Sequence, residues 1–165
     1  MDSQRQVQRT RLARLVSGGQ TGADRAALDV AIARGLPYGG WCPRGGWAED
    51  LTTAPGLLDP YPGRAETPSA DPEVRTRWNV RDSDATLVVR RPGLRSPGTD
   101  LTVAVAAGLG RPHLVTAGEA GEVVGWLLGL AGVVTLNVAG PRESEQPGGY
   151  DVTRRLLDEV LDALG

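Results

Sequence analysis

LARLVSGGQTGADRAALDVAIAR, residues 12–34, joins an apolar run to an amphipathic segment through a glycine-rich turn. The run at 12–17 has the length of a buried strand, and 24–34 has the apolar spacing of a helix that covers a sheet. The same alternation recurs along the rest of the chain. Such an alternation predicts βαβ units and a mainly parallel sheet.

The remaining elements follow from the same pattern. Predicted strands lie at 12–17, 36–41, 85–89, 113–116 and 133–138, and predicted helices at 24–34, 71–79, 100–109, 119–130 and 150–164. Right-handed crossovers in an open sheet favour the strand order 2-1-3-4-5. We therefore expect an α/β, Rossmann-like, doubly wound fold with a five-stranded sheet. Its ligand crevice should open at the carboxyl ends of strands 1 and 3.

Length and composition limit the class of protein. The 165 residues carry a formal net charge of −2, which excludes a general attraction to nucleic acid. We expect one domain at 12–165 behind a polar, flexible leader at 1–11, with no membrane span and a cytoplasmic location. The single cysteine, Cys42, excludes an intrachain disulfide. One cysteine and one histidine make a structural metal site an unfavourable interpretation.

The glycine-rich turn is the first candidate for ligand binding. Gly18, Gly19 and Gly22 allow backbone N–H groups and the positive end of the next helix to converge on an anion. The spacing matches neither the dinucleotide fingerprint nor the P-loop. The alternative is a tight turn that needs glycine only for packing, with Asp24 capping the helix rather than meeting a ligand hydroxyl.

Two further loops end at the same predicted edge of the sheet. Residues 90–100 contain three arginines and a glycine at a helix start, and 137–144 contain Asn, Gly, Arg and Ser. Arginine forks suit phosphate oxygens, although any one of these arginines taken alone fits a solvated surface. In the long segment after strand 2, Trp41, Arg44 and Trp47 either cover a planar ring or pack beneath the loop.

These loops define a candidate site for a phosphate-bearing ligand. The backbone N–H groups expected around an anion are those of Gly19, Gln20, Thr21, Gly98 and Thr99. The candidate ligand-binding residues are Gly18, Gly19, Gln20, Thr21, Gly22, Asp24, Trp41, Arg44, Pro97, Gly98, Thr99, Asp100, Asn137, Gly140 and Arg142. No nucleophile, base and orienting group can be named together, so no catalytic residue is assigned.

Five blocks of sequence, in order, resemble the molybdenum-carrier family. They are GGQTGADRAALDVA at 18–31, GGWCPRG at 39–45, AEDLTT at 48–53, ETPSADPEVRTRWNVRDSDATLVV at 66–89 and LNVAGPRESEQPGGY at 136–150. That family is a branch of the Rossmann-like superfamily containing the lysine-decarboxylase-like, or LOG, proteins. The resemblance implies a Rossmann-like fold, self-association and a nucleotide-like or phosphate-bearing ligand. The carrier name extends the ligand to molybdenum cofactor, a pterin with a phosphate.

One departure from the LOG proteins concerns catalysis. LOG enzymes that split a nucleoside monophosphate from its base carry PGGxGTxxE, with a catalytic glutamate three residues after the threonine. Here Pro97-Gly98-Thr99-Asp100 leads to Thr102 at that position. Asp100 lies two positions away along the helix and points elsewhere. The resemblance therefore carries over the binding loop and not the acid–base group.

The favoured function is binding or carriage of a phosphate-bearing nucleotide-like or pterin ligand, in a homodimer or larger assembly. Apolar residues of the last two helices predict the assembly: Trp126, Leu127, Leu130, Leu156, Leu157 and Leu161. The alternative is a nucleotide-processing hydrolase related to LOG phosphoribohydrolases. It would use Glu49, Asp50, Glu66 or Asp100. A purely structural role is the weakest hypothesis, because these loops exceed what packing requires.

Overall fold

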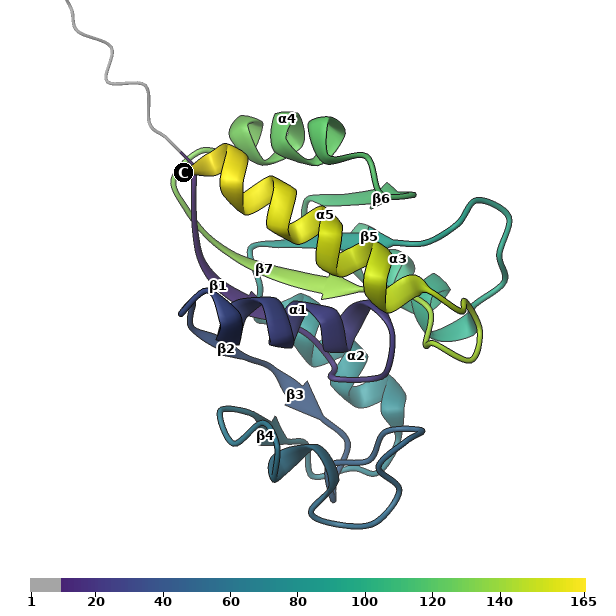
Figure 1. Ribbon diagram of the computed structural model, residues 1–165. Coiled ribbons are helices and arrows are strands. Elements are labelled where there is room, and N and C mark those ends of the chain that lie inside the picture. Colours follow the sequence, from purple (N-terminus) through teal and green to yellow (C-terminus); the bar gives the residue numbers. More distant parts are fainter. Residues whose placement is uncertain (1–9) are drawn as a thin grey trace, which may run out of the picture.

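The computed structural model describes residues 10–165 and contains a parallel sheet between two layers of helices (Figure 1). The strands are β1 (Arg11–Val16), β2 (Tyr38–Gly39), β3 (Trp41–Cys42), β4 (Ala65–Glu66), β5 (Ala85–Val89), β6 (His113–Thr116) and β7 (Val133–Ala139). The helices are α1 (Ala23–Ala33), α2 (Pro72–Arg81), α3 (Pro97–Gly108), α4 (Ala120–Leu130) and α5 (Gly149–Leu164), with a 3₁₀ turn at Gly56–Leu58. The predicted α/β fold with a five-stranded parallel sheet is confirmed.

The order of the strands differs from the expected 2-1-3-4-5. The sheet runs β2-β1-β7-β5-β6, so the last strand lies between the first and the third instead of at an edge. Leu136 pairs with both Leu15 of β1 and Ala85 of β5. Burial explains the placement, because Leu136 and Val138 are fully buried whereas Val115 of β6 is 40% exposed. Counted from β5 as the first strand, the same sheet reads 2-1-3-4-5.

The second predicted strand is divided between two sheets. Only Tyr38–Gly39 pairs with β1, and Trp41–Cys42 pairs with β4 in a separate two-stranded sheet. Gly40 allows the separation: its φ is +116°, and a Cβ there would lie 2.5 Å from the Ser17 carbonyl oxygen. The segment between β3 and β4 is thereby carried away from the main sheet (Figure 1).

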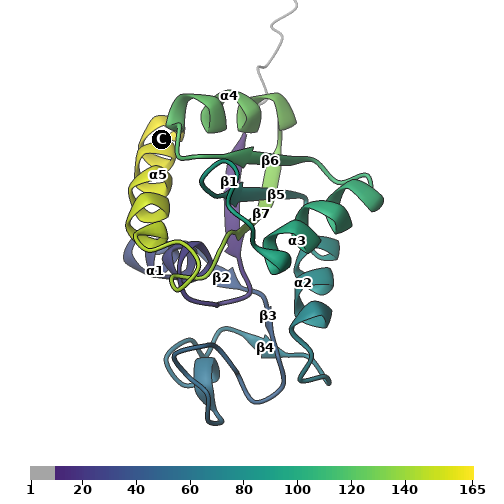
Figure 2. The same ribbon diagram turned by 90° about the vertical axis from the view of Figure 1, so that its right-hand side faces the viewer.

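The helices cover the two faces of the sheet unequally. Helices α1, α4 and α5 pack over one face, where they share a core with β1, β5 and β7. Helices α2 and α3 pack against each other on the other side (Figure 2). No helix within residues 10–165 is long and apolar enough to cross a bilayer.

The start of the folded domain differs from the expected one. β1 begins at Arg11, and the Thr10 hydroxyl donates to the Leu127 carbonyl oxygen, so residues 10 and 11 belong to the fold and not to the predicted leader. Residues 1–9 lie outside the described part.

The apolar residues expected to drive self-association are partly used inside the chain. Leu127, Leu156 and Leu157 are buried in its core and leave less apolar surface for a second copy. Self-association stays a prediction.

Candidate functional site

A pocket of about 370 Å³ opens at the carboxyl ends of β1, β7 and β5. The helices that follow β7 and β5, α5 and α3, lie on opposite faces of the sheet (Figure 2). This is the point where the winding of an open α/β sheet reverses and where ligands bind. The sequence placed the crevice between strands 1 and 3, but β7 occupies that gap. The reversal therefore lies between β7 and β5.

Three loops that the sequence singled out converge on this pocket. Gly18, Gln20 and Asp24 reach it from the β1–α1 connection. Pro97, Gly98 and Thr99 reach it from the first turn of α3, and Asn137, Gly140 and Arg142 from the end of β7.

The other predicted ligand-binding residues lie outside the pocket lining. Gly19, Thr21 and Gly22 form the outer side of the β1–α1 loop, and a Cβ at Gly22 would lie 2.5 Å from the Pro141 carbonyl oxygen. Arg44 lines a separate shallow hollow beside Trp47.

Trp41 and Asp100 are committed elsewhere. The Trp41 ring meets Trp78 edge-on with centroids 4.8 Å apart, and its Nε1 donates to Asp82. Asp100 faces outward, where it pairs with Arg90. The four carboxylates considered for hydrolysis, Glu49, Asp50, Glu66 and Asp100, are likewise absent from the pocket lining.

The β1–α1 loop does not offer all the backbone donors expected of it. Gly19 N donates to Ser17 Oγ at 3.2 Å, and Thr21 N donates to Gln20 Oε1 at 3.0 Å. Arg75 Nη1 donates to the Gly18 carbonyl oxygen at 2.9 Å, and Arg25 Nε donates to that of Gly19 at 3.0 Å. These contacts fix the loop and use two of its N–H groups internally. The loop thus differs from the anion cradle that its glycines suggested.

Of the two roles that the sequence allowed for Asp24, its position excludes the helix cap and places it in the pocket lining. Residue Gly22 caps α1 without a side-chain hydrogen bond, and Asp24 is 7% exposed and lines the pocket. Burial raises the pKa of Asp24 to about 6, and the nearby Arg75 and Arg64 oppose that rise only in part. A carboxyl group that titrates this close to neutrality inside a pocket is typical of functional sites.

The first turn of α3 presents free donors to the pocket. The N–H groups of Gly98 and Thr99 have no intrahelical acceptor at this position, and no side chain caps them. Ser96 Oγ lies 2.8 Å from Thr99 Oγ1 and also donates to Glu145 Oε1. A Cβ at Gly98 would meet nothing within 4 Å, so the backbone here is open.

Thr102 occupies the position of the LOG glutamate. Its hydroxyl donates to the Gly98 carbonyl oxygen at 3.0 Å, within its own helix. The side chain lines the pocket but carries no group that could donate or accept a proton near neutral pH.

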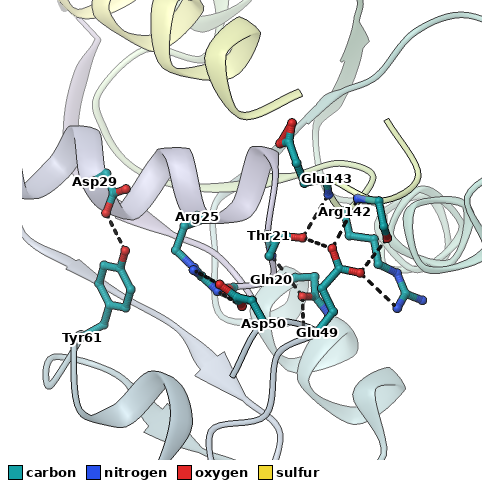
Figure 3. A network of polar contacts seen from close by, with 12 residues as sticks. Gln20, Thr21, Arg25, Asp29, Glu49, Asp50, Tyr61, Arg142 and Glu143 are labelled. Carbon is teal, nitrogen blue, oxygen red and sulfur yellow. Dashed lines mark hydrogen bonds and ion pairs between the residues drawn. The ribbon is translucent and has the colours of Figure 1, made fainter. Parts of the chain in front are cut away.

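Glu49 ties the long segment between β3 and β4 to both site loops. Its carboxylate accepts hydrogen bonds from the Thr21 hydroxyl and, at 2.6 Å, from Ser144 Oγ. Arg142 Nη1 lies 3.7 Å from Glu49 Oε2. Figure 3 shows how Thr21 and Arg142 lie around this carboxylate. Burial alone would raise the pKa of Glu49, but the hydrogen bonds from Ser144 and Thr21 outweigh it and lower the pKa. We name Glu49, Thr21, Ser144 and Arg142 the Glu49 clasp.

Replacing Glu49 with alanine should loosen this clasp. We expect the free energy of unfolding at pH 7 to fall by about 1–2 kcal/mol, because charge-assisted hydrogen bonds are lost. Since the folded pKa is lowered, the carboxylate stabilises the fold above its usual pKa of 4.5, and the effect fades as the pH falls below it. Urea unfolding at pH 7 and pH 3.5 measures both. Glu159→Ala, an exposed site on α5, is the control. Equal losses in the two variants would show that the clasp does not stabilise the fold.

Sequence reasoning missed one wall of the pocket, which α2 provides. Arg75, Thr76 and Asn79 line it. Asn79 Oδ1 accepts from Trp41 N at 2.7 Å, and this contact fixes α2 against β3. The one available signal was the spacing of Arg75 and Asn79 by four residues, which places both on one face of a helix.

Comparisons with known proteins agree with this architecture. The circularly permutated YpsA SLOG family matches residues 15–161. A solved structure described as "Putative molybdenum carrier protein from Syntrophus aciditrophicus SB" is 36% identical, with a TM-score of 0.79. It covers 91% of this chain, and the match covers 95% of that chain. No curated protein matches this sequence.

The strand order has the form that a circular permutation produces. Starting the count at β5 restores 2-1-3-4-5, so β1 and β2 stand where the last two strands of an unpermuted sheet would be. The resemblance to the molybdenum-carrier and LOG-like proteins is confirmed. The chain therefore belongs to the circularly permutated YpsA SLOG family.

Proposed function

We propose that the pocket binds a small molecule with a phosphate group and a planar ring, and that the protein carries this ligand without cleaving it. The observation that supports the proposal best is the first turn of α3 opening onto the pocket. The free N–H groups of Gly98 and Thr99 and the positive end of the helix favour a phosphate there.

Other features of the pocket favour the same class of ligand. Its volume of about 370 Å³ falls in the range of small-molecule sites. Arg142, 44% exposed, stands at the rim as a second source of positive charge. The half-buried Trp47 offers an aromatic surface to a ring.

A phosphorylated pterin, and hence molybdenum cofactor, fits this donor set. The first turn of α3 would hold the phosphate, and Trp47 with the polar floor of the pocket would hold the pterin. Residues 10–165 contain no group of three His, Cys, Asp or Glu side chains placed to ligate a metal.

Carriage is favoured over hydrolysis by the chemistry around α3. Thr102 replaces the glutamate of LOG enzymes, and its hydroxyl is bonded to its own helix. Hydrolysis of a nucleoside monophosphate remains an outcome that the experiments below would detect.

The proposal is tested by comparing phosphorylated and unphosphorylated ligands in calorimetric titrations. GMP should bind about tenfold or more tightly than guanosine, because each charge-assisted hydrogen bond to phosphate contributes free energy. Gly98→Val should remove most of that difference, since its side chain would project into the phosphate position. Gly108→Val is the matched control, because Gly108 lies in the same helix, also has no neighbour within 4 Å, and lines no part of the pocket.

Three further results would contradict the proposal. The first is equal binding of GMP and guanosine, or of a phosphorylated pterin and its parent pterin. The second is a folded Gly98→Val protein that keeps the full phosphate preference. The third is release of free base from nucleoside monophosphates, which would make the protein a hydrolase. Native mass spectrometry with metal analysis of fresh protein would identify any ligand that co-purifies.

A further inference from the structure

The Asp24 carboxylate is buried in the pocket floor with few partners. It is 7% exposed, and the backbone N–H of Gln20 lowers its pKa by hydrogen bonding. Within residues 10–165 it makes no ion pair. A carboxylate offers about four acceptor positions, and leaving them empty in a buried site is costly.

The arginines around Asp24 make their hydrogen bonds to groups other than its carboxylate, and Arg64 Nε makes none within residues 10–165. Arg75 on α2 donates to the Gly18 carbonyl oxygen, and Arg64, which precedes β4, donates to those of Gly39 and Trp41. Arg25 on α1 forms a bidentate pair with Asp50. These cations moderate the charge of Asp24 without filling its acceptor positions. The carboxylate thus remains available to a group inside the pocket.

Gln20 beside it is oriented as a donor. Its Oε1 accepts hydrogen bonds from Thr21 N at 3.0 Å and Glu49 N at 2.9 Å. That pairing fixes the orientation of the amide, so the Nε2 group is left to donate. Gln20 is 7% exposed and lines the pocket together with Asp24. The floor therefore combines one amide donor with an acceptor that can take two N–H groups.

From this arrangement, and resting on the proposed phosphate site, we infer that Asp24 and Gln20 recognise one edge of the ligand's ring by hydrogen bonds. Asp24 accepts a ring N–H and the adjacent exocyclic NH₂, and Gln20 donates to the neighbouring ring carbonyl. Guanine and pterin both present this edge. Xanthine and lumazine replace the NH₂ with an oxygen, and adenine presents an acceptor where the ring N–H should be.

The test is a set of titrations with two pairs of phosphorylated ligands. The parent protein should bind GMP about tenfold or more tightly than XMP, and a phosphorylated pterin more tightly than the matching lumazine, because the paired donors match the carboxylate. Asp24→Asn should reverse both preferences, since an asparagine NH₂ donates to the oxygen of xanthine or lumazine. Whichever pair binds more tightly identifies the source of the ring as a nucleotide or a pterin.

The controls separate this inference from the proposed phosphate site. Gly98→Val should weaken GMP and XMP by the same factor and leave their ratio unchanged. If Asp24→Asn remains folded and has the same ratio of GMP to XMP affinity as the parent protein, the proposed recognition of the ring is wrong, while the phosphate site stands. If phosphate contributes nothing to binding in any pair, the phosphate site itself is wrong.

Discussion

Asp24→Asn should make the folded protein more stable at neutral pH, by on the order of 3 kcal/mol. The pKa of Asp24 rises from the ordinary value of 3.8 to about 6 on folding. One pKa unit corresponds to about 1.4 kcal/mol, so the ionised carboxylate destabilises the fold by roughly this amount. Asparagine keeps an oxygen for the Gln20 N–H and removes the buried charge.

The sign of the pH dependence follows from the raised pKa. Well below pH 3.8, Asp24 is protonated in both states and costs the fold little. As the pH rises from 3.8 to about 6, the unfolded state ionises before the folded state, so stability is lost over this range and the loss is complete above it. The gain from Asp24→Asn should therefore be full at pH 7.5 and small at pH 3.5. Urea unfolding at both values measures it, with exposed Asp59→Asn as the control. A variant less stable than the parent at pH 7.5 would mean that the carboxylate has a stabilising partner in the free protein.

Of the glycine-to-alanine substitutions in the site, Gly140→Ala is expected to destabilise the fold most. An added Cβ would lie 2.4 Å from the Val89 carbonyl oxygen and 2.7 Å from Ala23 Cβ. Because backbone on one side and a helix start on the other cannot yield, β7 must move away from β5 or α1. We expect a loss of about 3 kcal/mol of stability, at the upper end of overpacking effects.

The same substitution should also impair binding, because Gly140 joins β7 to the rim residue Arg142. Thermal unfolding and titration with GMP measure the two effects. Gly129→Ala on α4 is the matched control, since Gly129 has no neighbour within 4 Å and alanine favours a helix. A Gly140→Ala protein as stable as the parent would show that the end of β7 is free to shift.

Local sequence pattern was sufficient for the positions of most strands and helices. The predicted strand 85–89 coincides with β5, and 133–138 is within a residue of β7, because short apolar runs between turns mark buried strands. The order of the strands was wrong because no local pattern states which strand is a neighbour. The consecutive buried residues Leu136, Asn137 and Val138 of β7 indicated a strand covered on both faces, which is typical of a central position. The topology rules for an unpermuted chain nevertheless placed this strand at an edge.

The sequence prediction named the loops of the candidate site, including Gln20 and Asp24 of its floor, and missed the wall that α2 provides. Glycines and polar residues at strand ends, such as Gly98 and Asn137, are visible in sequence because ligands bind where strands end. For Asp24 the sequence left helix capping and ligand binding open, because the burial that distinguishes them exists only in the packed fold. Arg75 lies on a polar helix that resembles a surface helix until α2 is packed against β3.

The central position of β7 affects how the chain reaches this fold during synthesis. Residues that must pair are far apart, as with Thr10 and Leu127, which are 117 positions apart. Without β7, residues 11–132 contain the pairs β2-β1 and β5-β6 but not the strand that joins them. The β1 and β5 edges obtain their shared neighbour only when Val133–Ala139 is present. We therefore expect the sheet to close only after β7 is made, and to fold more slowly than a sheet whose neighbouring strands follow each other in sequence.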